Sequence, residues 1–105
     1  MMLIVTTDTI PGKEIVQVIG LVKGGTVRSK HIGKDIAASF KTVVGGELNG
    51  YNEMLEETRQ IAIGRMVEEA EAQGANAIVA MRLQSSTITQ GAAEMVAYGT
   101  AVVVQ

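Results

Sequence analysis

The longest regular hydrophobic pattern lies between Gly45 and Ala80 and predicts an amphipathic helix, a glycine stop and a strand. In the helical part the residues of one stripe recur at i, i+3, i+4 and i+7. These residues are Tyr51, Met54, Leu55, Thr58, Ile61, Ala62, Met66 and Ala70. We expect the helix to end at Gly74, because glycine readily adopts the left-handed conformation that commonly follows a helix.

The start of this helix has several candidate positions. Asn49 and Asn52 are both suitable caps, and Glu47 could already be helical. A helix over residues 47–73 would be about 40 Å long at ~1.5 Å per residue, which is long for a domain of this size. Ile63 and Val67 widen the apolar surface beyond one stripe. We therefore expect the helix to pack against more than its own sheet, which is a first indication of a partner subunit.

Strand patterns flank the helical region on both sides. The expected strands cover residues 3–6, 14–22 with a continuation at 26–29, 78–87 and 95–104, with a loop at 7–12 and a turn at 90–93. Gly24-Gly25 is expected to interrupt the second strand as a bulge or turn, and residues 35–44 to form a short helix. Strands before and after helices predict one α+β domain over residues 1–105 with a mostly antiparallel sheet.

Two glycines and one arginine inside these elements carry further expectations. Gly64 in the helix and Gly99 in the last strand are expected to allow close approach of a neighbouring element, which would compensate the cost of glycine there. Arg65 is placed to pair with Glu68 or Glu69 one turn along the helix.

Composition narrows the class of protein. The chain of 105 residues is 47% hydrophobic but only 3% aromatic, so its core must be built from aliphatic side chains. A small apolar domain of this kind is expected to bury part of its surface in an oligomer. The net charge of −2 favours neither nucleic acid nor an anionic membrane as partner. No signal peptide or membrane span is predicted, so the expected location is the cytoplasm.

Five short segments resemble one known family, in the same order along the chain. They are VKGGTVRS at 22–29, IGKDI at 32–36, VGGEL at 44–48, GANAIV at 74–79 and YGTAV at 98–102. On these segments the chain is similar to the YbjQ family, also called UPF0145. The resemblance covers nearly the whole chain. It implies a small α+β subunit with a dodecin-like layout, assembled as a ring-shaped homopentamer. The family carries the label of a heavy-metal-binding domain and is otherwise uncharacterised.

The residues support this metal label only in part. Soft metals prefer thiolate or imidazole ligands, whereas the chain has no cysteine and the single histidine His31. A closed zinc site within one subunit is therefore excluded. Glu53 and Glu57 share a helix face at i, i+4 and could hold a divalent hard cation through oxygen ligands, and a ring would repeat His31 in each subunit. The alternative is a solvated acidic surface and a solvated loop histidine.

Other chemistries find little support. The chain has no GxSxG context, P-loop or GxGxxG motif. The candidate residues for a small ligand between subunits are Glu47, Tyr51, Asn76 and Arg82, since Asn76 and Arg82 stand in apolar surroundings. We keep three hypotheses: a non-enzymatic homopentamer that binds a metal ion or small ligand, a structural assembly without ligand, and an enzyme whose active site forms between subunits. The first predicts that these four residues converge at an interface, and the second predicts that each is paired off and buried within the fold.

Overall fold

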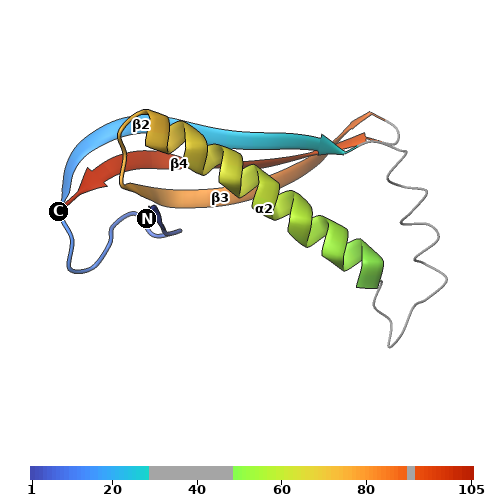
Figure 1. Ribbon diagram of the computed structural model, residues 1–105, viewed down its shortest axis with the longest axis horizontal. Helices are drawn as coiled ribbons and strands as arrows, with labels where there is room; N and C mark the ends of the chain where they lie inside the picture. Colours follow the sequence, from blue (N-terminus) through green and yellow to red (C-terminus); the bar gives the residue numbers. More distant parts are fainter. Residues whose placement is uncertain (29–48, 90–91) are drawn as a thin grey trace.

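The protein folds as a small α+β domain with a mixed four-stranded sheet and, in the described part, one long helix (Figure 1). The computed structural model describes residues 1–28, 49–89 and 92–105. Its elements are β1 (Leu3–Ile4), β2 (Ile15–Arg28), α2 (Asn49–Ala72), β3 (Ala77–Thr89) and β4 (Ala92–Val104). The strand order is β1-β3-β4-β2. The expected short helix at 35–44 lies outside the described residues, as do His31 and Glu47.

The sheet is antiparallel except at one edge. β4 runs antiparallel to both β2 and β3, whereas the short β1 pairs in parallel with the start of β3. The expectation of a mostly antiparallel sheet is therefore confirmed. The predicted turn at 90–93 is too long, because Ala92 and Ala93 already belong to β4. Among the described residues, no helix has the length and hydrophobicity that a membrane span needs.

The expected interruption of the second strand at Gly24-Gly25 is wrong. β2 is one continuous strand, and Gly24 and Gly25 pair regularly with Ala97 and Val96 of β4. Its irregularities occur earlier, between Ile15 and Gln17 and between Val18 and Gly20. A side chain at Gly24 would overlap the backbone of α2, with the carbonyl oxygen of Ala62 and the amide nitrogen of Met66. This glycine lets the helix lie directly on the strand.

Helix α2 ends as the sequence predicts. Gly74 has a φ of 86°, the amide of Gly74 donates to the carbonyl of Glu71, and the amide of Ala75 donates to that of Ala70. This pair of bonds is a Schellman motif, which satisfies carbonyls that the end of a helix leaves without partners. At the other end, Asn52 lies inside the helix and does not begin it.

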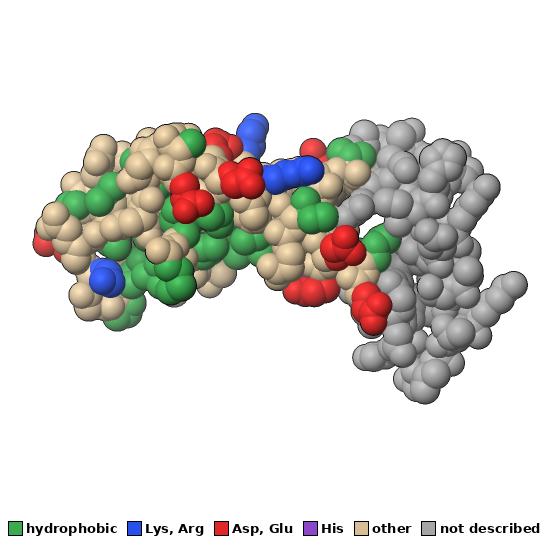
Figure 2. All heavy atoms as spheres, viewed as in Figure 1, with side chains coloured by type: hydrophobic (Ala, Val, Ile, Leu, Met, Phe, Trp, Pro, Cys, Tyr) green, Lys and Arg blue, Asp and Glu red, His purple; other side chains and the backbone are tan. Residues whose placement is uncertain are grey.

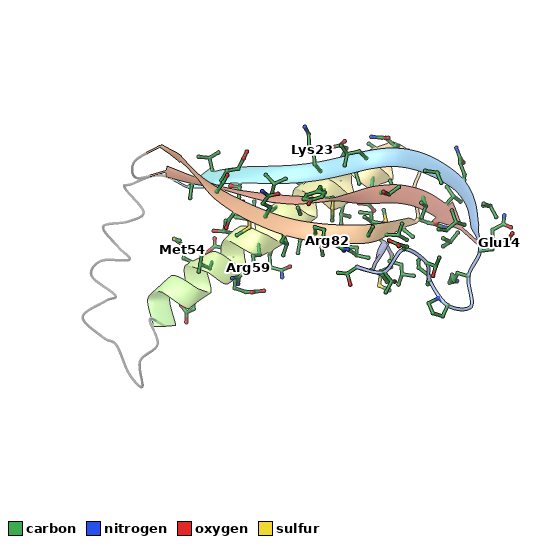
Figure 3. The ribbon with its side chains drawn as sticks, turned by 180° about the vertical axis from the view of Figure 1, so that it is seen from behind. Glu14, Lys23, Met54, Arg59 and Arg82 are labelled. Carbon is green, nitrogen blue, oxygen red and sulfur yellow. The ribbon has the colours of Figure 1, made fainter. Side chains whose placement is uncertain are left out.

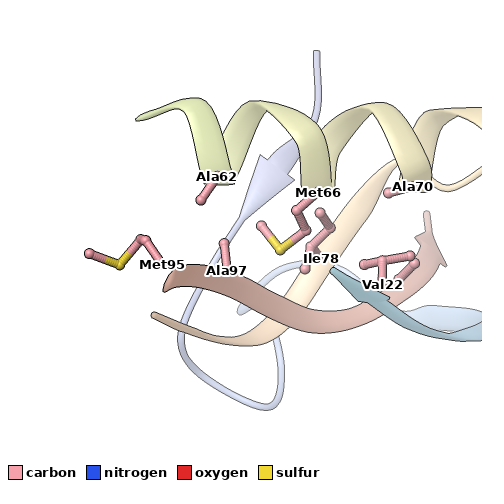
Figure 4. Close-up of a cluster of buried hydrophobic side chains, with 8 residues drawn as sticks. Val22, Ala62, Met66, Ala70, Ile78, Met95 and Ala97 are labelled. Carbon is pink, nitrogen blue, oxygen red and sulfur yellow. The ribbon is translucent and has the colours of Figure 1, made fainter. Parts of the chain in front are cut away.

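The main core lies between α2 and the sheet (Figure 4). Thr58, Ala62, Met66 and Ala70 are buried at spacings of four residues, as the stripe predicted. From the sheet, the fully buried side chains that face the helix are Val22, Ile78, Ala97 and Ala101. The many alanines on both sides keep the helix close to the strands, so the core is thin.

Two glycine expectations have opposite outcomes, and Arg65 has a different partner from the one expected. A Cβ at Gly99 would lie 2.7 Å from Cγ2 of Ile78, so close packing there is confirmed. Gly64 is exposed, and a Cβ added to it would meet nothing within 4 Å. Arg65 Nη1 donates to the carbonyl of Gly25 at 2.6 Å, which fastens α2 to β2 instead of pairing with a glutamate of its own helix.

A second, smaller cluster lies on the sheet face away from α2. Its buried members are Ile10, Ala77, Val79, Val102 and Val104. Partly buried residues of the N-terminal segment, which comprises residues 1–14 before β2, pack against them. This segment is hydrogen-bonded along β3: the amide of Val5 donates to Ile78, and the amide of Met81 donates to Val5. The N-terminal segment therefore covers one end of this face and leaves the rest of it uncovered.

Candidate functional site

The part of the sheet face opposite α2 that no described residue covers is the surface on which candidate residues gather. Paired residues of neighbouring strands point to the same side of a sheet. Tyr98 of β4 pairs with Lys23 of β2 on one side and with Arg82 of β3 on the other. These three residues thus form one row across the face. Figure 3 shows the sheet from the side away from the helix, with Lys23 and Arg82 labelled. We call this row, together with the exposed residues on both sides of it from Val18 to Val27 along β2, the open face.

The open face has large apolar side chains on its edge strand. Val18, Leu21 and Val27 of β2 are 66%, 67% and 57% exposed. The register places Val18 level with Val102 and Leu21 level with Thr100, on the side away from α2. An antiparallel sheet with one solvated face normally has polar residues there. Strand β2 departs from that rule, which is typical of a surface that makes a contact.

Arg82 stands on the open face and is partly committed to the fold. Its Nη1 donates to the carbonyl of Thr6 at 2.9 Å and to that of Met81 at 2.8 Å. The first bond helps to hold the N-terminal segment against β3. The side chain is exposed, and the guanidinium has further N–H donors. Glu47, the other charged candidate for the ligand site, lies outside the described residues.

Asn76 uses its side-chain amide within the fold. Nδ2 donates to the carbonyl of Val104 at 2.9 Å, and Oδ1 accepts the amide of Val104 at 2.8 Å. Asn76 directly precedes β3, and its side chain takes the place of a backbone partner for Val104, the last residue of β4. This pairing is what the second hypothesis expects, whereas the burial that it also expects is not found, since Asn76 is exposed.

A single copy of the chain does not bring the predicted ligand residues together. Tyr51 lies near the start of α2, while Asn76 follows its end, and Figure 1 shows these two ends of the helix far apart. Since α2 spans residues 49–72, the two are separated by about 30 Å along the helix at ~1.5 Å per residue. A site that includes both must draw them from two copies.

The predicted carboxylate ligands lie on the exposed side of α2. Glu53 and Glu57 are both exposed and one turn apart, and acidic side chains follow the course of the helix in the space-filling view (Figure 2). Nearby Glu56 accepts hydrogen bonds from Gln60 at 3.0 Å and from Arg59 at 3.3 Å. These bonds, first from Gln60 and then from Arg59, lower the pKa of Glu56 below its usual value. Within the described residues, no three metal-ligating side chains of Asp, Glu, His or Cys form a group.

Sequence reasoning missed Lys23 and Tyr98, which complete the row of Arg82. Both occupy positions that alternate with neighbours on the helix side, Val22 and Gly24 on β2 and Ala97 and Gly99 on β4. The sequence shows this alternation, but the row can be recognised only when the register between the three strands is known. The register is irregular at two places in each of the two antiparallel strand pairs, and periodicity alone does not locate these places.

The family model described as "Putative heavy-metal-binding" matches residues 2–105. Among curated proteins, a UPF0145 protein of Clostridioides difficile strain 630 is 69% identical over 104 residues, which is 99% of this chain and 93% of the relative. A UPF0145 protein of Clostridium perfringens is 72% identical over 97% of this chain and 96% of its own. One from Fervidobacterium nodosum is 56% identical over 96% of this chain and 94% of its own.

A solved structure has a similar fold. It is a protein of unknown function of the DUF74 family from Pediococcus pentosaceus, with a TM-score of 0.66 over 99% of this chain and 98% of that one. The sequence identity is 14%, so the likeness concerns the fold alone.

Proposed function

Since the chain belongs to the YbjQ (UPF0145) family, we propose that it is a non-enzymatic, cytoplasmic protein that assembles with itself and binds a metal ion or small ligand between its subunits. The proposed assembly is a ring-shaped homopentamer. The ligand residues of the proposal are Glu47, Tyr51, Asn76 and Arg82, and the metal ligands are Glu53, Glu57 and His31.

The observation that supports self-assembly is the set of exposed aliphatic side chains on β2. Leu21 and Val27 extend from an edge strand on a face that no described element covers. Removing such side chains from water is favourable by about 25 cal/mol per Å² of apolar surface. A long edge strand also has backbone groups free to pair with another chain. Both features favour a contact with another copy.

The ligand part of the proposal is supported by the family description and by the exposed carboxylates of α2. Glu53 and Glu57 supply oxygen ligands, which hard divalent cations prefer. One helix turn provides only two side chains, so a third ligand would come from another copy or from residues outside the described part. The proposed metal is therefore a hard cation held between subunits, in contrast to a soft metal bound by sulfur.

A structural assembly without ligand is the second candidate. It is favoured by Asn76, whose amide is engaged with Val104 on both of its polar atoms. It is also favoured by the bonds from Arg82 to the carbonyls of Thr6 and Met81. On this hypothesis, Asn76 holds the end of β4, and Arg82 holds the N-terminal segment against β3.

Native mass spectrometry of gently purified protein, with and without a chelator, tests the proposal. A multi-subunit mass with an additional stoichiometric mass that the chelator removes supports a metal-binding assembly. The double variant Glu53→Gln/Glu57→Gln should lose this additional mass. The control Glu68→Gln/Glu71→Gln removes the same charge near the other end of α2 and should retain it. A bare multi-subunit mass that added Mg²⁺ or Ca²⁺ leaves unchanged supports the structural assembly, and a single-chain mass rejects both.

A further inference from the structure

The sheet has two free edges on opposite sides. β2 is the last strand on one side, and no described strand lies beyond it. On the other side, the N-terminal segment accompanies β3 only over its first part, where Ala80 donates to Thr7 and Met81 to Val5. Beyond Met81, β3 continues to Thr89 with β4 as its only neighbour in the described part. As far as the described residues go, backbone N–H and C=O groups along both edges are therefore available for pairing.

The two free edges lie at the same height of the sheet. Lys23 of β2 and Arg82 of β3 are both level with Tyr98 of β4. Further along, Val27 and Ser86 are both level with Glu94. The free part of β2 after its second bulge and the free part of β3 thus match in height and length, about 26 Å at ~3.3 Å per residue.

The two edges also run in the same direction, since β2 and β3 are both antiparallel to β4. A rotation about an axis parallel to the strands preserves strand direction. It therefore places β2 of one copy beside β3 of the next, in a parallel pair. Such a contact joins two different edges, so each copy keeps one free edge for another neighbour. The copies form a closed ring when the repeated rotation adds up to a full turn.

We infer that copies of this chain join edge to edge, with residues 21–28 of β2 pairing in parallel with residues 82–89 of β3 of the next copy into one continuous sheet. This inference rests on the self-assembly proposed above and specifies its surface. The partner is a second copy because the chain itself carries both matching edges. Leu21 and Val27, which are exposed in one copy, then lie beside the neighbour's strand on the same face.

Cysteine cross-linking tests this contact, and the chain has no cysteine of its own to interfere. The double variants Val27→Cys/Ser86→Cys and Val27→Cys/Gln84→Cys place thiols on both edges of the open face. The second covers a register shift of two residues. Within one copy the strands of these residues are separated by β4, so their Cα atoms lie about 9.6 Å apart. That exceeds the ~7 Å limit for a disulfide, so any bond must join two copies.

After mild oxidation, at least one double variant should give a ladder of linked chains on a non-reducing gel, which a reductant collapses to one band. Each single variant should remain one band, because the contact brings two different edges together. The control Val27→Cys/Glu68→Cys places one thiol on α2 and should also remain one band. Dimers from Val27→Cys alone would indicate β2-to-β2 pairing and overturn the inference.

The native mass distinguishes a failure of the edge-to-edge contact from a failure of self-assembly. A multi-subunit mass without a ladder from either double variant overturns the edge-to-edge contact but leaves self-assembly standing. A single-chain mass for the unmodified protein overturns both.

Discussion

The two faces of the sheet are formed by the same strands but are completed in different ways. On one face α2 lies so close to β2 that Gly24 has no room for a side chain. The side chains that meet there are mostly small, and Met66 and Ile78 fill the space between them. On the other face the N-terminal segment covers one end, and Leu21 and Val27 remain exposed.

We propose that this difference separates the residues that fold one copy from those that would join copies. The α2 face buries its apolar residues within a single chain, so it should determine the stability of the subunit. The open face carries apolar residues that the described part of a single chain leaves exposed, so changes there should act on the proposed assembly. Substitutions matched between the two faces test this division.

The largest expected effect is at Gly24. Gly24→Ala places a methyl group against the backbone of Ala62 and Met66, and only a shift of α2 away from the sheet can relieve that overlap. We expect a loss of about 4 kcal/mol in the free energy of unfolding, measured by urea denaturation. The control is Gly25→Ala on the open face, where the nearest atom to the new Cβ is 3.7 Å away. Equal effects of the two substitutions would contradict the close contact.

Met66 and Leu21 form the next matched pair. Met66→Ala removes a fully buried side chain and should lower the free energy of unfolding by about 3 kcal/mol, because it leaves a cavity under α2. Leu21→Ala should change the stability of the single chain by less than about 0.5 kcal/mol, since the side chain is exposed. Leu21→Ala should instead shift the protein toward smaller masses on dilution, as measured by sedimentation velocity. A reversed pattern would invalidate the division between the faces.

Asn76 should have an intermediate effect. Asn76→Ala removes both bonds to the backbone of Val104, so we expect a loss of about 1 to 2 kcal/mol in the free energy of unfolding. Amide hydrogen exchange should also accelerate at Val104, whose N–H loses its acceptor. The control is Gln84→Ala on the open face, which should be close to neutral. If Asn76→Ala leaves stability unchanged but abolishes ligand binding, Asn76 belongs to the ligand site.

The smallest expected effect concerns Glu56 on the exposed side of α2. Hydrogen bonds from Gln60 and Arg59 lower its pKa below the usual 4.5, so the ionised carboxylate is favoured in the folded state. Its contribution to stability is present above pH 4.5 and is lost as the pH falls through the lowered pKa. The difference in urea midpoint between the unmodified protein and Glu56→Gln should therefore shrink at acidic pH. Added salt should reduce this difference at neutral pH, because the Glu56 side chain is 61% exposed and its charge is therefore screened; a difference independent of pH would contradict the assignment.

Local patterns in the sequence determined much of the secondary structure. The stripe predicted the buried side of α2, and Gly74 predicted its end, because both depend on residues within one or two turns. The last strand was predicted to end at Val104, as it does. The five family segments identified the family, although they carry no information about the surface proposed for contact between copies.

Contacts between distant residues decided the rest. Gly24-Gly25 resembles a break in a strand when only its neighbours are considered, but α2 makes it a contact point with residues nearly forty positions away. Likewise, the partner of Asn76 is Val104, 28 residues further along the chain. The open face emerged only when the register of three strands was known. Periodicity assigns residues to two sides of an element, whereas packing decides which side is covered.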